Sequence, residues 1–177
     1  MQNIKSKFQL IIFLLFLITH CTYSQLSDAW LGKWKGELLI YNEAGTDKLI
    51  SIHMELHIYK TDTAGIYKWR IIYNDSTKDD RKYLLRTIDQ KKGKYAIDEK
   101  DGILLEMNLF DNTILSRIEV DGFLLDIIYK LETDKIIFET ISGSSKPGST
   151  STSITEKYDV LSYTISNYQR AYLYNSP

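Results

Sequence analysis

Apolar and polar residues alternate along almost the whole chain after residue 25. The clearest segment runs from Leu49 to Tyr59, where every second residue is apolar. These apolar residues share one face: Ile50, Ile52, Met54, Leu56 and Ile58. Polar residues, including two histidines, occupy the other face. Because successive side chains of a strand point to opposite sides, this period of two predicts a strand with one buried face.

The same alternation predicts about ten strands, with no helix beyond a possible turn at 27–31. The first strands are expected at about 33–41 and 49–59. Further strands are expected to carry Tyr67–Tyr73, Arg81–Leu85, Tyr95–Ile97, Ile103–Leu109, Ile114–Val120, Phe123–Tyr129 and Ile136–Phe138, and one or two more to lie across 158–165 and 168–174. Asp101-Gly102 and Asp121-Gly122 are typical tight hairpin turns.

These strands predict an all-β fold. Short connections make neighbouring strands antiparallel, and about ten amphipathic strands cannot remain an open sheet in water. They must close into a barrel or fold into two packed sheets. A sandwich needs long crossing connections, which the pattern lacks, so we predict an up-and-down antiparallel β-barrel of about ten strands.

The first residues have the features of a signal peptide. Lys5 and Lys7 precede an apolar run from Phe8 to Ile18, which is too short for a comfortable membrane span. Small residues before Gln25 predict cleavage after Ser24, and therefore export to the periplasm or beyond, with no transmembrane span in the mature chain. The alternative is a lipoprotein anchored through Cys21, the only cysteine.

The remaining residues, 25–177, are expected to form a single domain. The chain of 177 residues has a formal net charge of −1, with basic and acidic residues mixed. Nucleic-acid binding is not expected, because it needs a basic patch. Residues 142–155 are rich in Ser, Thr and Gly and predict a mobile loop.

The first expected strand opens with Gly32-Lys33-Trp34-Lys35-Gly36. This Gly-x-Trp-x-Gly start resembles that of the calycin, or lipocalin-like, superfamily, and its spacing is similar to the fatty-acid-binding and nitrobindin branches. The wider chain resembles small exported proteins of Bacteroidetes-type bacteria. The resemblance implies a barrel with an internal cavity for a small apolar or amphipathic ligand. Nitrobindin-like proteins hold haem through a late histidine, and no histidine follows His57, so no cofactor is expected.

An inward aromatic face supplies the candidate ligand site. We expect Arg81, Tyr67, Tyr73 and Tyr83 either to form the polar end of a cavity that binds an anionic or hydroxylated ligand, or to leave Arg81 in water at the rim. Glu99 is a possible partner of Arg81. Convergent donors among aromatic walls are typical of ligand pockets. The remaining candidates on this face are Trp34, Trp69 and Tyr95, and Trp34 has the alternative role of sealing one end of the barrel.

Arg170 and Tyr172 lie two apart on the last expected strand and share a face. The resemblance implies two inward roles for Arg170: to hold a ligand carboxylate, as in fatty-acid-binding proteins, or to cover the first-strand Trp, as in lipocalins. Ala171 and Leu173 form the more apolar parity, which instead favours Arg170 in solvent.

Catalytic and metal chemistry are not expected. His53 and His57 are roughly 13 Å apart along an extended strand and cannot both bind one ion. The chain has no nucleophile elbow and no phosphate loop. The sequence therefore predicts an exported barrel that binds a small molecule, with a side-chain-filled barrel that contacts a partner in the cell envelope as the alternative.

Overall fold

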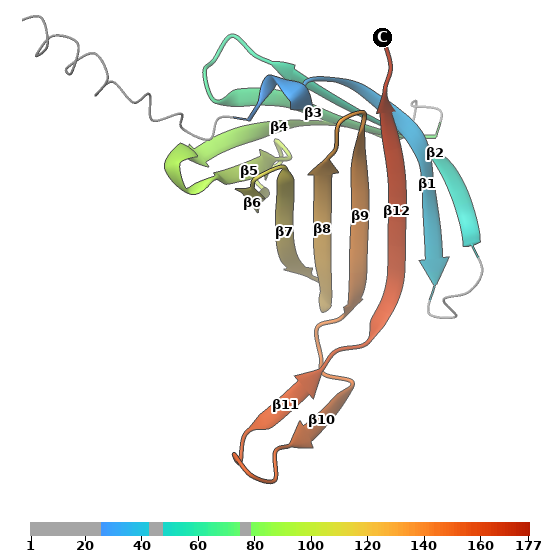
Figure 1. Cartoon of the computed structure of the whole chain (residues 1–177), viewed down its shortest axis with the longest axis vertical. Helices are drawn as coiled ribbons and strands as arrows, with labels where there is room; N and C mark the ends of the chain where they lie inside the picture. The colour runs from blue at the N-terminus through green and yellow to red at the C-terminus, as the bar shows by residue number, and fades with distance from the viewer. Residues whose placement is uncertain (1–25, 43–47, 75–78) are drawn as a thin grey trace, which may run out of the picture.

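The computed structural model describes residues 26–42, 48–74 and 79–177. They form a short 3₁₀ turn η1, a closed antiparallel barrel of ten strands and a separate two-stranded hairpin (Figure 1). The barrel strands are β1 (Gly32–Asn42), β2 (Lys48–Lys60), β3 (Ile66–Tyr73), β4 (Asp80–Asp89), β5 (Lys94–Asp98), β6 (Leu104–Phe110), β7 (Thr113–Val120), β8 (Phe123–Leu131), β9 (Lys135–Ser144) and β12 (Ile165–Asn175). The helical turns are η1 (Asp28–Trp30) and η2 (Gln90–Lys92).

The barrel closes where β12 pairs with both β1 and β9. All other pairs join neighbours in sequence. The predicted up-and-down barrel is therefore confirmed, and closure leaves no open edge in this sheet.

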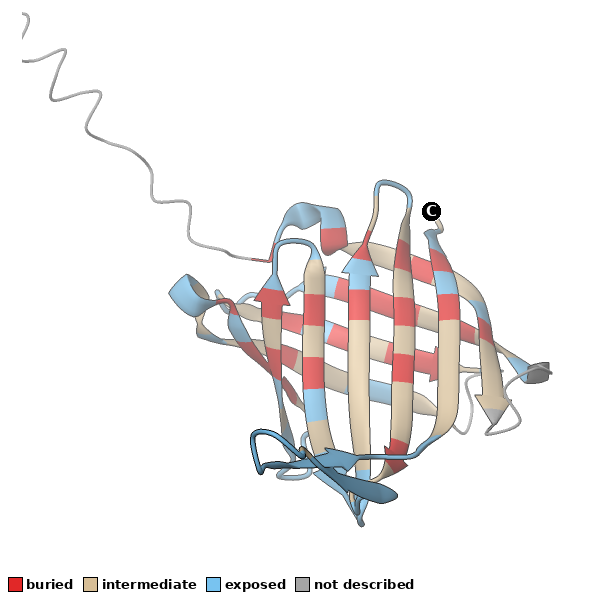
Figure 2. Cartoon of the chain, turned by 60° about the horizontal axis from the view of Figure 1, so that its bottom comes forward, coloured by how far each residue is buried: buried red, intermediate tan, exposed pale blue. Residues whose placement is uncertain are grey.

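One end of the barrel is filled by side chains, and η1 lies across it. Trp30 and Trp34 are buried there, and the Trp34 indole N–H donates a hydrogen bond to the Trp30 carbonyl over 3.0 Å. Figure 2 shows the buried residues of the strands gathered in the part of the barrel away from the hairpin. Trp34 thus occupies the sealing position that was one of its two predicted roles.

Gly36 lets the first and last strands approach closely at this end. A Cβ atom built on Gly36 would lie 2.1 Å from the Tyr172 carbonyl oxygen, far inside van der Waals contact. The second glycine of the opening motif is therefore required by packing at the closure seam.

The predicted loop 142–155 instead contains the end of β9 and a strand. Strand β10 (Ser149–Thr152) pairs with β11 (Asp159–Ser162), and the resulting hairpin projects from the barrel (Figure 1). The Ser, Thr and Gly composition indicates a loop, but the alternating Ser and Thr of β10 and Val160 of β11 also suit a small exposed hairpin.

Among the described residues, none of the helical segments has the length and hydrophobicity needed to pass through a bilayer. The predicted signal peptide, residues 1–24, and Cys21 lie outside the described residues.

Candidate ligand cavity

A cavity of about 330 Å³ lies inside the barrel toward the end from which the hairpin projects. This volume is at the lower end of the range for small-molecule pockets. Its apolar wall comes from all around the barrel, with Leu38, Ile52, Ile71, Ile97, Leu105, Ile127 and Phe138 among its members. The barrel is therefore not filled by side chains throughout, and this part of the alternative is wrong.

Two aromatic residues form the floor of the cavity. Trp69 and Tyr129 are buried and meet edge to face, with 5.1 Å between their ring centroids. Phe138 lies against Tyr129 at 5.0 Å. Burial raises the pKa of Tyr129 far above its usual value, so this hydroxyl stays neutral at any physiological pH. The floor is therefore aromatic and uncharged.

Polar side chains gather at one side of the mouth, on β3, β4 and the segments next to them. They are Tyr73, Asp79, Arg81, Tyr83 and Glu99. The Arg81 Nε donates to Asp79 over 2.9 Å, and its guanidinium lies 4.9 Å from the Tyr73 ring centroid. Burial raises the pKa of Tyr73. Burial and the Glu99 carboxylate raise the pKa of Tyr83, while Arg81 opposes this.

Arg81 is therefore a rim residue, about half exposed, and its ion-pair partner is Asp79. The expected partner Glu99 lines the same cavity but forms no ion pair among the described residues. Asp79 immediately precedes β4 and lies two residues before Arg81. In an extended chain, side chains two residues apart project to the same side, so Arg81 pairs with this near neighbour.

Away from this polar cluster, parts of the rim are apolar. At the strand ends next to the cavity, residues of the inward parity become exposed to solvent. Ile50, Val120 and Phe123 each expose about half of their surface, at 52, 52 and 53 %. These exposed apolar side chains border the entrance of the cavity.

Four of the nine predicted site residues line this cavity: Trp69, Tyr73, Arg81 and Tyr83. Three others, Trp34, Tyr67 and Tyr95, are buried at the filled end and do not reach the cavity. All three have the correct inward parity, but Tyr67 lies one inward position beyond Trp69 on β3, Tyr95 lies one inward position beyond Ile97 on β5, and Trp34 packs against η1. The alternation of apolar and polar residues shows which side chains point into the barrel, but not how far each lies from its mouth.

The prediction that Arg170 and Tyr172 line the cavity is wrong. Ala171 and Leu173 are fully buried, so Arg170 and Tyr172 point outward. Arg170 donates to Glu139 of β9 over 2.8 Å and lies over the Tyr168 ring, while the Tyr168 hydroxyl also donates to Glu139. Burial and Glu139 raise the pKa of Tyr168 to about 12. This cluster joins β12 to β9 outside the barrel.

The cavity residues that the sequence reasoning missed include Tyr129, Thr140 and Gln169. Tyr129 lies on the inward face that the alternation predicts for its strand, so the sequence pattern was sufficient to identify it as a candidate. Thr140 and Gln169 pair across β9 and β12 and contribute polar atoms to the wall opposite Arg81. Their position depends on the register at the seam, which local sequence does not specify.

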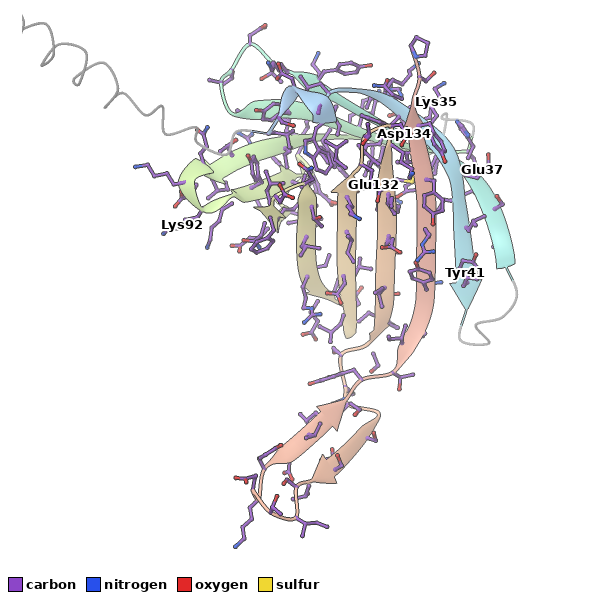
Figure 3. All side chains as sticks on the ribbon, in the orientation of Figure 1. Lys35, Glu37, Tyr41, Lys92, Glu132 and Asp134 are labelled. Carbon is purple, nitrogen blue, oxygen red and sulfur yellow. The ribbon has the colours of Figure 1, made fainter. Side chains whose placement is uncertain are left out.

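The His53–Glu55–His57 face forms a polar network on the outer surface of β1–β3. Lys35, His53 and His57 all contact Glu55, with 2.7 Å between His57 Nε2 and the carboxylate. Figure 3 shows the neighbouring Lys35 and Glu37 along β1. Burial disfavours the charge on Glu55, but its hydrogen bonds from Lys35, His57 and His53 prevail and lower its pKa to about 2.

This outer network and the rest of the described chain contain no cluster of His, Cys, Asp or Glu arranged to hold a metal ion. Both histidines instead turn toward the one carboxylate between them, that of Glu55. Burial lowers the pKa of His57.

No family model matches the chain, and no curated protein matches it. Among solved structures, it is similar to an S-type phycobiliprotein lyase from Guillardia theta, at 11 % identity and a TM-score of 0.53, covering 85 % of this chain and 90 % of that one. It is also similar to a variant of the fluorescent protein UnaG, at 14 % identity and a TM-score of 0.45, covering 85 % of this chain and 99 % of that one. At 11 % identity the likeness to the lyase concerns the fold alone, which is a closed antiparallel β-barrel.

Proposed function

We propose that this protein binds a small amphipathic molecule inside its barrel. The observation that carries this proposal is the cavity of about 330 Å³, with an aromatic floor, an apolar wall and a polar group at the mouth. A ligand would bury its apolar part between Trp69, Tyr129 and the aliphatic side chains. Its polar end would remain near Tyr73, Arg81 and Tyr83. Pockets of this composition typically bind by shape, with a few polar groups setting orientation.

A cavity-filling substitution tests the proposal. Ile127→Phe adds a ring to a wall residue, and we expect it to weaken binding of the neutral lipophilic dye Nile red at least about tenfold. The matched control is Ile128→Phe, because Ile128 is the next residue of β8 and points outward. Unchanged dye binding in a folded Ile127→Phe protein would contradict the proposal. Native mass spectrometry of the purified protein then identifies any ligand that it retains.

We also propose that residues 1–24 direct export and are removed, as their charge and apolar pattern suggest. Intact-mass measurement of the protein from its host would give a mature chain that begins at Gln25. A chain that begins at a lipid-modified Cys21 would support the anchored form instead, and an uncleaved chain would contradict export by this route.

Contact with an envelope partner is a second candidate role, favoured by the exposed hairpin. The hairpin and its flanks expose apolar side chains, namely Ile154, Tyr158, Val160, Leu161 and Tyr163. Photo-crosslinking in the host from position 161, with position 51 on the outer barrel as control, tests this role. A crosslink of defined mass from position 161 alone would support it.

A further inference from the structure

We propose that the preferred ligand of the cavity carries a protonated amine on its apolar part. This inference rests on the proposed binding function and specifies the ligand's polar end. It follows from the balance of charges at the mouth, from the partners that those charges already have, and from the aromatic faces beside them.

The described residues that line the cavity include three charged side chains, which are Asp79, Arg81 and Glu99. Their formal charges sum to −1, because two carboxylates face one guanidinium. The tyrosines beside them are held neutral, since burial raises the pKa of both Tyr73 and Tyr83. A ligand entering the mouth therefore meets an excess of negative charge.

The positive charge of Arg81 is already paired with a carboxylate of the protein itself. Arg81 bonds to Asp79 over 2.9 Å and covers the Tyr73 ring at 4.9 Å, so its charge and one of its faces are occupied. A ligand carboxylate would have to compete with Asp79 for the guanidinium. It would also lie near Glu99, and like charges at short range raise the free energy of the complex.

Of the three charged residues that line the cavity, Glu99 is the one without an ion-pair partner among the described residues. It is half-buried, and its backbone N–H donates to the Ile103 carbonyl over 3.1 Å, which fixes its backbone at the start of the β5–β6 turn. The β4–β5 register pairs Leu84 with Asp98, so the next residue, Glu99, lies opposite Tyr83. Among the described residues Glu99 forms no ion pair, and its side-chain hydrogen-bond partner is the neutral Tyr83 hydroxyl, so its charge remains available to a ligand cation.

The surroundings of Glu99 suit an ammonium group. Tyr83 and Trp69 are cross-strand partners on the inward face, and aromatic faces attract cations. The guanidinium of Arg81 over Tyr73 is the same interaction within the protein. An alkylammonium ligand would place its charge against the Glu99 carboxylate, beside the Tyr83 side chain that hydrogen-bonds to it, and its chain over Trp69.

Three probes of equal chain length test the inference by calorimetric titration at pH 7: octylamine, octanol and octanoate. We expect octylamine to bind at least about tenfold more tightly than octanoate, with octanol between them. Octanol reports on the cavity itself. If octanol binds and octanoate binds as tightly as octylamine, the amine preference is wrong and the cavity function stands. If none of the three binds, both are wrong.

Substitutions assign the preference to its residue. Glu99→Gln should reduce octylamine affinity about tenfold and leave octanol affinity unchanged, whereas Glu99→Asp should keep most of the preference. The matched control is Glu106→Gln, since Glu106 is an exposed carboxylate that points outward from β6. A folded Glu99→Gln protein that still prefers the amine would overturn the assignment, and octanol binding verifies that the cavity is intact.

Discussion

At the residue scale, the two tryptophans that were predicted to face the cavity, Trp34 and Trp69, have different roles because they lie at different depths in the barrel. Trp34 and Trp69 are both buried and both point inward. Trp34 bonds to the backbone of the η1 turn at the filled end, whereas Trp69 forms part of the cavity floor. Depth within the barrel, more than residue type, therefore decides whether an aromatic residue can contact a ligand.

The variant Trp34→Phe tests this division. It removes the hydrogen bond to the Trp30 carbonyl and leaves that buried acceptor unpaired, which costs about 1–3 kcal/mol. We expect urea denaturation to show this loss, while the affinity for Nile red changes less than about twofold. Trp69→Phe is the comparison variant and should weaken dye binding. Loss of dye binding in folded Trp34→Phe protein would show that Trp34 contacts the ligand.

At the element scale, alternation was sufficient to find the barrel strands and insufficient to place them relative to one another. The face of β2 that carries Met54, Leu56 and Ile58 is fully buried, as predicted. The partner of Arg81 and the polar wall residues Thr140 and Gln169 could not be predicted. Their neighbours depend on turn conformation and seam register, which arise from contacts between distant segments.

The outer polar face of β1–β3 gives an element-scale prediction about pH. The pKa of Glu55 is about 2 in the folded protein, below its ordinary value of 4.5. The folded state therefore binds fewer protons there than the unfolded state. This contribution to stability is complete above pH 4.5 and is lost as pH falls toward 2. Part of the network is exposed, so we expect about 1 kcal/mol.

Glu55→Gln removes the titrating group and should flatten the decline in unfolding free energy between pH 4.5 and 2. Urea denaturation across this range measures it. Glu119→Gln is the control, because Glu119 is exposed on β7 and should leave the pH profile unchanged. An unaltered profile in Glu55→Gln would show that the network does not stabilise the fold.

The hairpin gives a second element-scale prediction. Every residue of β10 and β11 is exposed, and the two strands pair only with each other. The Gly148 N–H donates to the Ser162 carbonyl over 2.8 Å, so the chain enters and leaves the hairpin at neighbouring points. Replacing residues 149–162 with a two-glycine linker should therefore shift the barrel's thermal midpoint by only a few degrees. A loss of cooperative unfolding in this deletion would contradict it.

At the scale of the whole molecule, the fold depends on one long-range seam. Leu38 of β1 pairs with Ala171 of β12, and both side chains are fully buried. The sequence separation across this seam is nearly the full length of the barrel domain, so closure is expected to be slow relative to hairpin formation. The cavity shares this dependence, because β1 and β12 supply Leu38 and Gln169 to its wall.

Truncation after Tyr163 removes β12 and tests this dependence. Strands β1 and β9 would lose their common partner, expose unpaired backbone groups and open the core to water. We expect no cooperative thermal transition and no Nile red binding. The hairpin deletion is the natural control: it removes fourteen residues, 149–162, and β12 itself has eleven. If the truncated protein unfolds cooperatively and binds dye as the hairpin deletion does, the seam is dispensable. If only the hairpin deletion retains both properties, stability and ligand binding require the closed barrel.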